Sequence, residues 1–206
     1  FIGAGATVGS MFLATVWVYQ ALYADAGGRR IDLATTVEKS VKQNLDTRQV
    51  RTETGEMGRA AAIGFWWDQH RFGNVTHALI GYGIGASRSR GIGAGEMAIR
   101  YRLAIDRSSL SMLLWDVGVL GLAAFLALLG SGAAIASRLA RHAAIPPFHT
   151  AVLGAVAPAL VLFALALPYN ADLLTNPAIQ VLLMLLLGQV VYWHRMLQSM
   201  PGGSSP

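Results

Sequence analysis

Four long apolar stretches constrain the fold of this chain more than any other feature of its sequence. They cover residues 1–24, 108–136, 151–168 and 178–194, and Asp116 is the only charged residue within them. An α-helix needs about 20 apolar residues to cross the hydrocarbon core of a bilayer, within a range of about 17–25. The sequence therefore predicts an all-α polytopic membrane protein with about four transmembrane helices.

The composition agrees with a membrane protein and excludes several other classes. Hydrophobic residues make up 54% of the 206 residues and charged residues only 13%, whereas about a quarter of a soluble domain is charged. The chain has no cysteine, which excludes disulfide frameworks, Cys-ligated metal sites and thiol nucleophiles. It begins at Phe1, inside an apolar run and without an initiator Met, so we interpret it as part of a longer membrane protein.

The charged residues concentrate between the first two apolar stretches. Residues 25–107 hold 13 of the 16 Lys and Arg and 9 of the 11 Asp and Glu, which predicts one large, mostly helical loop outside the membrane. The short loop 137–150 and the tail 195–206 carry arginines, whereas the short loop 169–177 carries only an acid. The positive-inside rule therefore places the loop 137–150 and the tail in the cytoplasm. The large loop is then expected on the periplasmic face of a bacterial inner membrane.

Periodicity within the large loop predicts three helices, over residues 32–45, 58–72 and 96–107, with a polar loop over residues 48–58. In the second of these helices, four residues fall on one face of a 3.6-residue period: Arg59, Ile63, Trp66 and His70. In the third, Arg100 and Arg107 are expected to share a face.

Seven arginines lie within 49 residues of this loop: Arg59, Arg71, Arg88, Arg90, Arg100, Arg102 and Arg107. The guanidinium group pairs bidentately with phosphate oxygens, so the cluster suits a lipid-linked phosphate or diphosphate. The alternatives are a solvated basic loop and contact with anionic headgroups. Arg59 fits a binding site best, because its helix face is otherwise apolar and aromatic.

The glycines of residues 81–86 match the spacing of the dinucleotide-binding fingerprint, but the surrounding strands and helices that this fingerprint needs are absent from the sequence pattern. We therefore expect a tight turn where the backbone approaches another group closely. His70, His77 and Asp68 lack a diagnostic metal-ligand spacing, so no metal site is expected.

Two further features leave alternatives open. Asp116 lies inside an apolar stretch, where an acid is costly unless it is paired or faces water, so it is either the partner of an Arg or part of the wall of a site. Trp66, Trp67 and Trp115 form either an interfacial aromatic belt or stacking platforms for sugar rings.

Three stretches in order resemble the O-antigen ligase and polymerase superfamily of membrane glycosyltransferases. Gly58 and Arg59 followed by Trp66 resemble its Gly-Arg…Trp segment, and residues 77–85 resemble its P-x-x-G-x-G-x-G stretch. Residues 108–122 resemble its helix H-N-x-x-L-x-x-L-x-E-x-G-x-x-G, with Asp116 in place of the Glu. The resemblance covers residues 58–122. The His of the H-N pair is replaced here by Arg107 or Asp106, which favours a repeat-unit polymerase over a ligase.

The resemblance implies a polymerase that joins polyprenyl-diphosphate-linked oligosaccharide repeat units into a surface polysaccharide. The acceptor hydroxyl attacks the anomeric carbon with inversion and expels the lipid diphosphate. The implied catalytic residues are the arginines Arg59, Arg88 and Arg107, which clamp the diphosphate. The candidates for a base are Asp106 and His77, and the alternative is that no base is needed, because the diphosphate is a good leaving group. The implied substrate-binding residues are Arg71, Arg90, Trp66, Gly81, Gly83 and Gly85.

No metal or other cofactor is expected, because arginine supplies the positive charge. The expected partners are the lipid-linked glycan and membrane lipid, with a chain-length regulator as a further candidate, and not nucleic acid. The alternatives are an O-antigen ligase of the same superfamily, a noncatalytic membrane scaffold, and a transporter fragment. Convergence of the three clamp arginines on one cavity would favour the enzyme, and scattered arginines would favour the scaffold.

Overall fold

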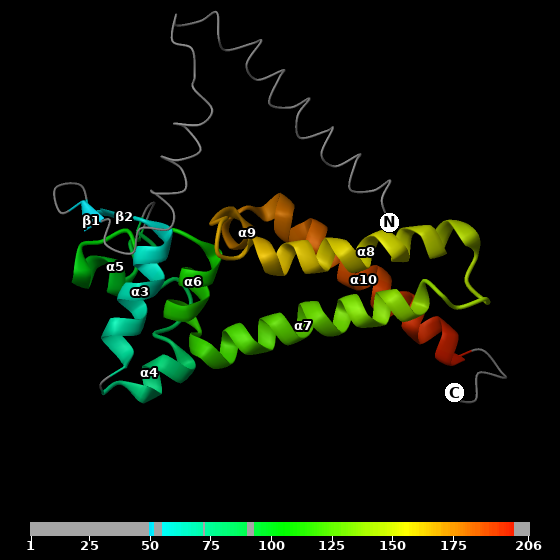
Figure 1. Ribbon diagram of the computed structural model, residues 1–206, viewed down its shortest axis with the longest axis horizontal. Helices are drawn as coiled ribbons and strands as arrows, with labels where there is room; N and C mark the ends of the chain where they lie inside the picture. Colours follow the sequence, from blue (N-terminus) through cyan, green and yellow to red (C-terminus); the bar gives the residue numbers. More distant parts are fainter. Residues whose placement is uncertain (1–49, 52–54, 72, 90–92, 200–206) are drawn as a thin grey trace, which may run out of the picture. The chain divides into compact units, whose positions relative to one another are not determined.

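The computed structural model describes residues 50–51, 55–71, 73–89 and 93–199 (Figure 1). This part of the chain is mostly helical. Its helices are α3 (Arg59–His70), α4 (Val75–Ile80), α5 (Glu96–Tyr101), α6 (Ser109–Asp116), α7 (Gly118–Leu139), α8 (Pro147–Ala166), α9 (Asp172–Thr175) and α10 (Pro177–Ser199). The strands β1 (Val50–Arg51) and β2 (Glu56–Met57) form an antiparallel ladder in which Val50 is opposite Met57. The predicted span 1–24 and the predicted helix 32–45 lie outside the described residues.

Three of the described helices are long and apolar enough to cross a membrane. They are α7 with 22 residues, α8 with 20 and α10 with 23. At about 1.5 Å per residue, α7 is about 33 Å long, which matches a hydrocarbon core of about 30 Å. A mostly helical fold with candidate membrane spans agrees with the predicted all-α membrane protein.

The apolar stretch 108–136 is not the single helix that the sequence predicted. It divides into α6 and α7, because Val117 leaves helical geometry with φ −123° and ψ 1° and Gly118 takes a φ of +68°. A β-carbon on Gly118 would lie 2.5 Å from the carbonyl carbon of Leu79, so the close approach of α4 also requires glycine here. The break frees the end of α6 to make hydrogen bonds outside the helix.

Two smaller predictions in the large loop also need correction. The helix predicted over residues 96–107 ends at Tyr101, because Arg102 takes the left-handed conformation with φ 54°. Arg100 and Arg107 therefore do not share a helix face. The segment 48–58, predicted as loop, contains the β1–β2 ladder. The helix predicted over residues 58–72 is confirmed as α3.

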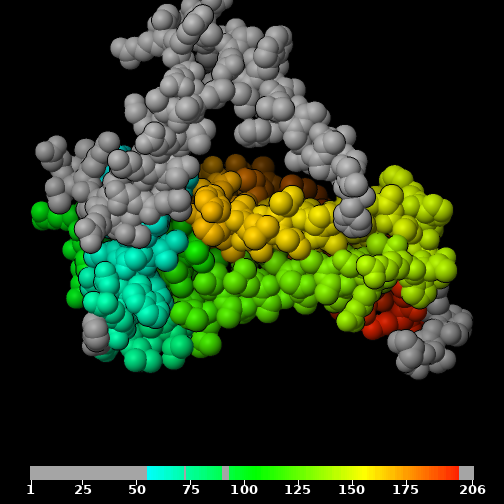
Figure 2. All heavy atoms as spheres, viewed as in Figure 1, coloured from blue at the N-terminus to red at the C-terminus, as the bar shows by residue number. Residues whose placement is uncertain are grey.

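Within the part of the chain that the structure describes, the buried residues form two separate hydrophobic clusters. The first joins α7, α8 and α10 around Leu129, Leu153, Leu160 and Leu183, and the space-filling view shows α7 and α8 touching along their length (Figure 2). The second cluster joins α3, α5 and α6 around Trp115, which is fully buried. Most of the long side chains on the outer faces of the three long helices are exposed, as expected for helices that face lipid.

Candidate functional site

The start of α6 fixes the place of the charged pair Asp106 and Arg107. Ser108 caps the helix: its hydroxyl accepts a hydrogen bond from the Ser111 backbone N–H at 3.2 Å, and the Ser111 hydroxyl accepts one from the Ser108 N–H at 3.1 Å. Such reciprocal capping satisfies donors that a helix start would otherwise leave unpaired. Ser109 donates to the Asn170 carbonyl through both its hydroxyl (2.6 Å) and its backbone N–H (2.9 Å). The start of α6 is thereby tied to the turn before α9.

The end of α6 holds the glycine-rich loop. The Asp116 carboxylate accepts hydrogen bonds from the backbone N–H of Gly85 at 2.8 Å and of Ser87 at 2.9 Å. The Asp116 carbonyl accepts a third, from the Gly83 N–H at 2.9 Å. Hydrogen bonds to a carboxylate are roughly twice as strong as neutral ones. The partners of Asp116 are thus backbone amides and not an arginine.

A second carboxylate holds the next residues of the same loop. Asp106 accepts from the Ser89 backbone N–H at 2.9 Å and from the Ser89 hydroxyl through its other oxygen. Arg88 therefore lies between two residues whose amides are bound by carboxylates, Ser87 by Asp116 and Ser89 by Asp106. Its backbone position is fixed, although its own side chain is exposed.

Two adjoining cavities lie beside the start of α6, and the anchored loop lines the larger of them. The larger, of about 670 Å³, is lined by Ile84, Gly85, Arg88, Asp106, Met112, Leu113, Asp116, Val117, Leu174, Thr175 and Gln180. The smaller, of about 330 Å³, is lined by Arg59, Asp106, Arg107, Met112, Ala171, Asp172 and Thr175. Asp106, Met112 and Thr175 belong to both. The arginines Arg59, Arg88 and Arg107, called the site arginines below, therefore border two cavities that share part of their lining.

The formal charges that line the two cavities balance, because the three site arginines are matched by three aspartates: Asp106, Asp116 and Asp172. Among the described residues, no carboxylate lies within 4.0 Å of the guanidinium of Arg88 or Arg107. Both oxygens of Asp106 already accept hydrogen bonds from Ser89. The apolar part of the larger cavity comes from Ile84, Leu113 and Leu174, among others. The pair of cavities can accommodate a ligand with an anionic part and an apolar part.

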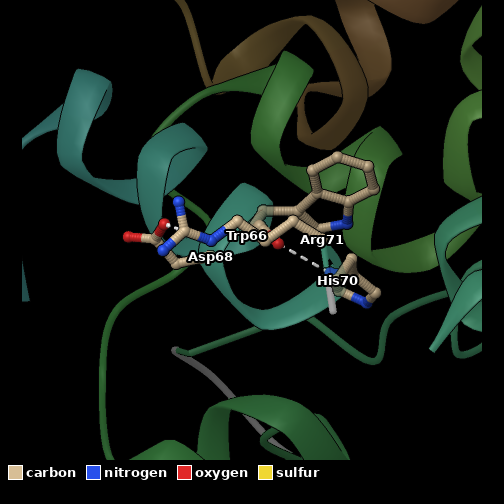
Figure 3. Close-up of polar contacts among 4 residues, drawn as sticks. All are labelled: Trp66, Asp68, His70 and Arg71. Atoms are coloured by element: carbon tan, nitrogen blue, oxygen red, sulfur yellow. Dashed lines mark hydrogen bonds and ion pairs between the residues drawn. The ribbon is translucent and has the colours of Figure 1, made fainter. Parts of the chain in front are cut away.

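Trp66 and His70 belong to the core and not to the cavities. Trp66 is 5% exposed, and its indole N–H donates to the Leu114 carbonyl at 3.0 Å. His70 donates from Nδ1 to the Trp66 carbonyl at 2.7 Å and stacks on the Trp66 ring at 4.7 Å (Figure 3). In this position Trp66 cannot stack on a sugar ring. Of the three tryptophans considered as platforms, Trp67 is the exposed one, at 61%.

Several other residues predicted for the site lie away from the cavities. Arg71 pairs with Asp68 at 3.6 Å on the outer side of α3, and both side chains are about half exposed or more (Figure 3). The His77 Nδ1–H donates to the Gly81 carbonyl at 3.2 Å, and its ring stacks on Tyr82 at 4.3 Å. Neither residue lines either cavity. Arg90 lies outside the described residues.

The glycines predicted to bind substrate have different places. Gly81 is buried against the end of α6, where a β-carbon would lie 2.5 Å from the Val117 nitrogen. Gly83 has a φ of +106° and open space beside it, and only Gly85 lines the larger cavity. The expected close approach of the backbone is confirmed at Gly81, and the group it approaches is the α6–α7 break and not a nucleotide.

The phenol of Tyr82, in the same loop, has a raised pKa. Burial raises the pKa of the Tyr82 phenol above its ordinary value of 10.0, and the nearby Tyr101 raises it further, against the opposing effect of Arg100. The phenol is therefore neutral at physiological pH. It accepts a long hydrogen bond from Asn74, at 3.4 Å, and packs between His77 and Trp115.

Sequence reasoning missed the part of the cavity wall that follows α8. Thr175 and Gln180 come from α9 and the first turn of α10, where the sequence predicted a short loop and the start of a span. The sequence feature that could have indicated this wall is the polar stretch from Asn170 to Asn176. Its hydrogen bond with Ser109, however, is not visible in any sequence pattern. Within the described residues, no group of three or more His, Asp or Glu could hold a metal ion.

No protein-family model, no curated protein and no solved structure matches this chain. The resemblance to the O-antigen ligase and polymerase superfamily therefore depends on the motif residues quoted above.

Proposed function

We propose that the chain belongs to a membrane glycosyltransferase of the bacterial inner membrane that polymerises polyprenyl-diphosphate-linked repeat units on the periplasmic face. The observation that supports this most is that the site arginines border two adjoining cavities. They come from three separate segments, the start of α3, the glycine-rich loop and the residue before the α6 cap. Arginines of a merely basic surface would have no reason to meet at one pair of cavities.

The chemistry follows from the charge and the lining. In the smaller cavity, which Asp106 and Asp172 also line, Arg59 and Arg107 are placed to pair with the diphosphate of the donor. The apolar part of the larger cavity suits the lipid next to it. A hydroxyl oxygen of the acceptor glycan forms a bond to the anomeric carbon of the donor. The bond from that carbon to the diphosphate oxygen breaks, and the diphosphate leaves with the electron pair. Guanidinium groups beside the leaving diphosphate stabilise this growing negative charge more than the ground state.

We assign the role of proton acceptor to Asp106 and not to His77. Asp106 is the acid that both cavities share, whereas His77 lines neither and is engaged by Gly81 and Tyr82. The acceptor proton passes to the Asp106 carboxylate as the new glycosidic bond forms. Ser89, which donates two hydrogen bonds to this carboxylate, holds it in place.

Deletion of the gene in the source organism tests the proposal. We expect long polymer to disappear and single lipid-linked repeat units to accumulate when the glycans and lipid-linked intermediates are separated on a gel. Polymer that is still made but is no longer joined to its lipid acceptor would indicate a ligase instead. Unchanged glycans would refute a glycan-transfer function and favour the scaffold or transporter alternatives.

Complementation of the deletion identifies the residues. Arg59→Ala and Arg88→Ala should each abolish polymer without changing the amount of protein in the membrane. The matched control is Arg138→Ala, because Arg138 is an exposed arginine in the last turn of α7 and lines neither cavity. Normal polymer from both site variants would show that these arginines do not bind the donor.

A further inference from the structure

The short helix α4 and the loop after it expose aliphatic side chains that the described residues leave uncovered. Val75 is 67% exposed, Leu79 42%, Ile80 59% and Ile84 94%; these four residues are called the α4 patch. No charged residue occurs between positions 73 and 87. Groups of exposed apolar residues of this kind mark sites of contact with a membrane or another protein.

The α4 patch is fixed beside the beginning of α7. The backbones touch so closely that a β-carbon on Gly118 would lie 2.5 Å from the Leu79 carbonyl carbon and 2.6 Å from the Gly81 nitrogen. The Gly83 N–H also donates to the Asp116 carbonyl, just before the break. The position of α4 along α7 is therefore set by backbone contacts and not by flexible side chains.

The length of α7 determines where the contact between α4 and α7 lies relative to the hydrocarbon core of the membrane. At about 1.5 Å per residue its 22 residues give about 33 Å, so the whole helix is needed to cross a hydrocarbon core of about 30 Å. Gly118, the first residue of α7, then lies at the edge of that core, and the α4 patch lies at the same level. The first turn of α7 continues the apolar surface with Val119 (41% exposed) and Leu120 (56% exposed).

We propose that the α4 patch inserts into the bilayer interface next to the start of α7, where the acyl chains and upper glycerol region of the lipid cover it. Apolar helix faces at membrane interfaces are buried about 5–10 Å into the boundary between headgroups and acyl chains. Continuity with the lipid-facing surface of α7 and the absence of charge over residues 73–87 identify lipid as the occupant. This inference depends on α7 crossing the membrane and is independent of the reaction proposed above.

The insertion has a consequence for the cavities. Arg88 lies four residues after Ile84 in the sequence and lines the same cavity. With Ile84 among acyl chains, the Arg88 guanidinium lies at the level of lipid phosphates. The larger cavity then opens at the membrane surface, so its ligand enters from the bilayer and not from the aqueous phase.

Single cysteines test the insertion cleanly, because the chain has none of its own. Ile80→Cys and Ile84→Cys are labelled with bimane in the full chain, reconstituted into phosphatidylcholine–phosphatidylglycerol nanodiscs. Ile99→Cys is the matched aqueous control: Ile99 is 62% exposed, as Ile80 is 59%, but it lines a separate cavity with Glu56 and Arg102. Leu128→Cys on α7, where Leu128 is 48% exposed, is the lipid control.

We expect the labels at positions 80 and 84 to emit at shorter wavelength than the label at 99, to be quenched by lipid-attached nitroxide and to be protected from iodide. The proposal would be overturned, with α7 still a span, by two results together. Iodide would quench the labels at 80 and 84 as much as the label at 99, and nitroxide would quench the label at 128. Protection from both quenchers would overturn it as well, because protein and not lipid would then cover the patch. Iodide quenching at 128 would remove the span on which the proposal depends.

Discussion

Replacement of Gly81 by alanine tests how the glycine-rich loop is attached to the α6–α7 break. Gly81 has φ 73° and ψ −167°, a conformation that is essentially restricted to glycine. Its missing β-carbon leaves room for the backbone of Asp116 and Val117, with the Val117 nitrogen 2.5 Å from where that carbon would be. Alanine at this position therefore has to accept an unfavourable backbone conformation and a steric overlap with backbone atoms that cannot rotate away.

The structure gives the size of the effect. Backbone strain contributes about 1–3 kcal/mol, and the overlap contributes about 1–3 kcal/mol as overpacking. We expect a loss of about 2–6 kcal/mol in the free energy of unfolding, which lowers Tm by about 4–24 °C at about 2–4 °C per kcal/mol for a chain of this size. Thermal unfolding in detergent, followed by intrinsic tryptophan fluorescence, measures this shift.

Substitutions at two other glycines distinguish the effect of backbone strain from that of steric overlap. Gly83 also has a positive φ, of +106°, but nothing lies within 4 Å of its β-position, so Gly83→Ala should show the strain alone. Gly64 lies inside α3, also with open space beside it, and Gly64→Ala should raise stability by about 1 kcal/mol through helix propensity. The same Tm for Gly81→Ala and Gly83→Ala would refute the close approach of the loop to the end of α6.

Three more predictions use the same unfolding assay. Asp116→Asn should lower stability by about 1.5–3 kcal/mol, because one amide oxygen cannot accept from both the Gly85 and Ser87 N–H groups; wild-type stability would show that these bonds contribute little. Burial raises the pKa of Tyr82, so the folded state holds this proton more tightly than the unfolded state. Stability should be unaffected below about pH 10 and should fall as the pH rises through the raised pKa, and the fall should be smaller in Tyr82→Phe; an equal fall in both proteins would contradict this. Once the smaller ring area is allowed for, Trp66→Phe should lower the free energy of unfolding by about 1 kcal/mol more than Trp115→Phe does. The Trp66 N–H donates a hydrogen bond to the Leu114 carbonyl, whereas the buried Trp115 N–H has no hydrogen-bond partner among the described residues.

The sequence predicted the membrane character of the chain because long apolar runs need no tertiary information. The helix at residues 59–70 was also predictable, since its buried face repeats with the helical period. The division of residues 108–136 was not, because apolarity does not distinguish one long helix from two. The signals present were Asp116 and Gly118, an acid and a glycine two residues apart, and their meaning depends on the glycine-rich loop that packs against them.

Candidate site residues were predictable by type but not by place. The site arginines meet at the cavities because Ser109 ties α6 to Asn170 and because Asp116 and Asp106 bind backbone amides on either side of Arg88. These contacts join residues 17 to 61 positions apart, which no local pattern encodes. Trp66 was predicted as a platform for sugar rings because it is an aromatic residue at helical spacing. It is instead buried in the core, where its indole N–H donates to the Leu114 carbonyl.

Binding of a short polyprenyl diphosphate tests the central claim most directly, because it needs no knowledge of the sugar. Farnesyl diphosphate is titrated into the purified protein in detergent by calorimetry, with farnesol as the control for its lipid part. We expect binding that requires the diphosphate and that weakens about 10–100-fold in Arg59→Ala, Arg88→Ala and Arg107→Ala, from the loss of about 1.5–3 kcal/mol per charged hydrogen-bonding group. Arg138→Ala should bind as the wild type does. No binding of farnesyl diphosphate, or equal affinity in all four variants, would contradict the claim that the site arginines form an anion site.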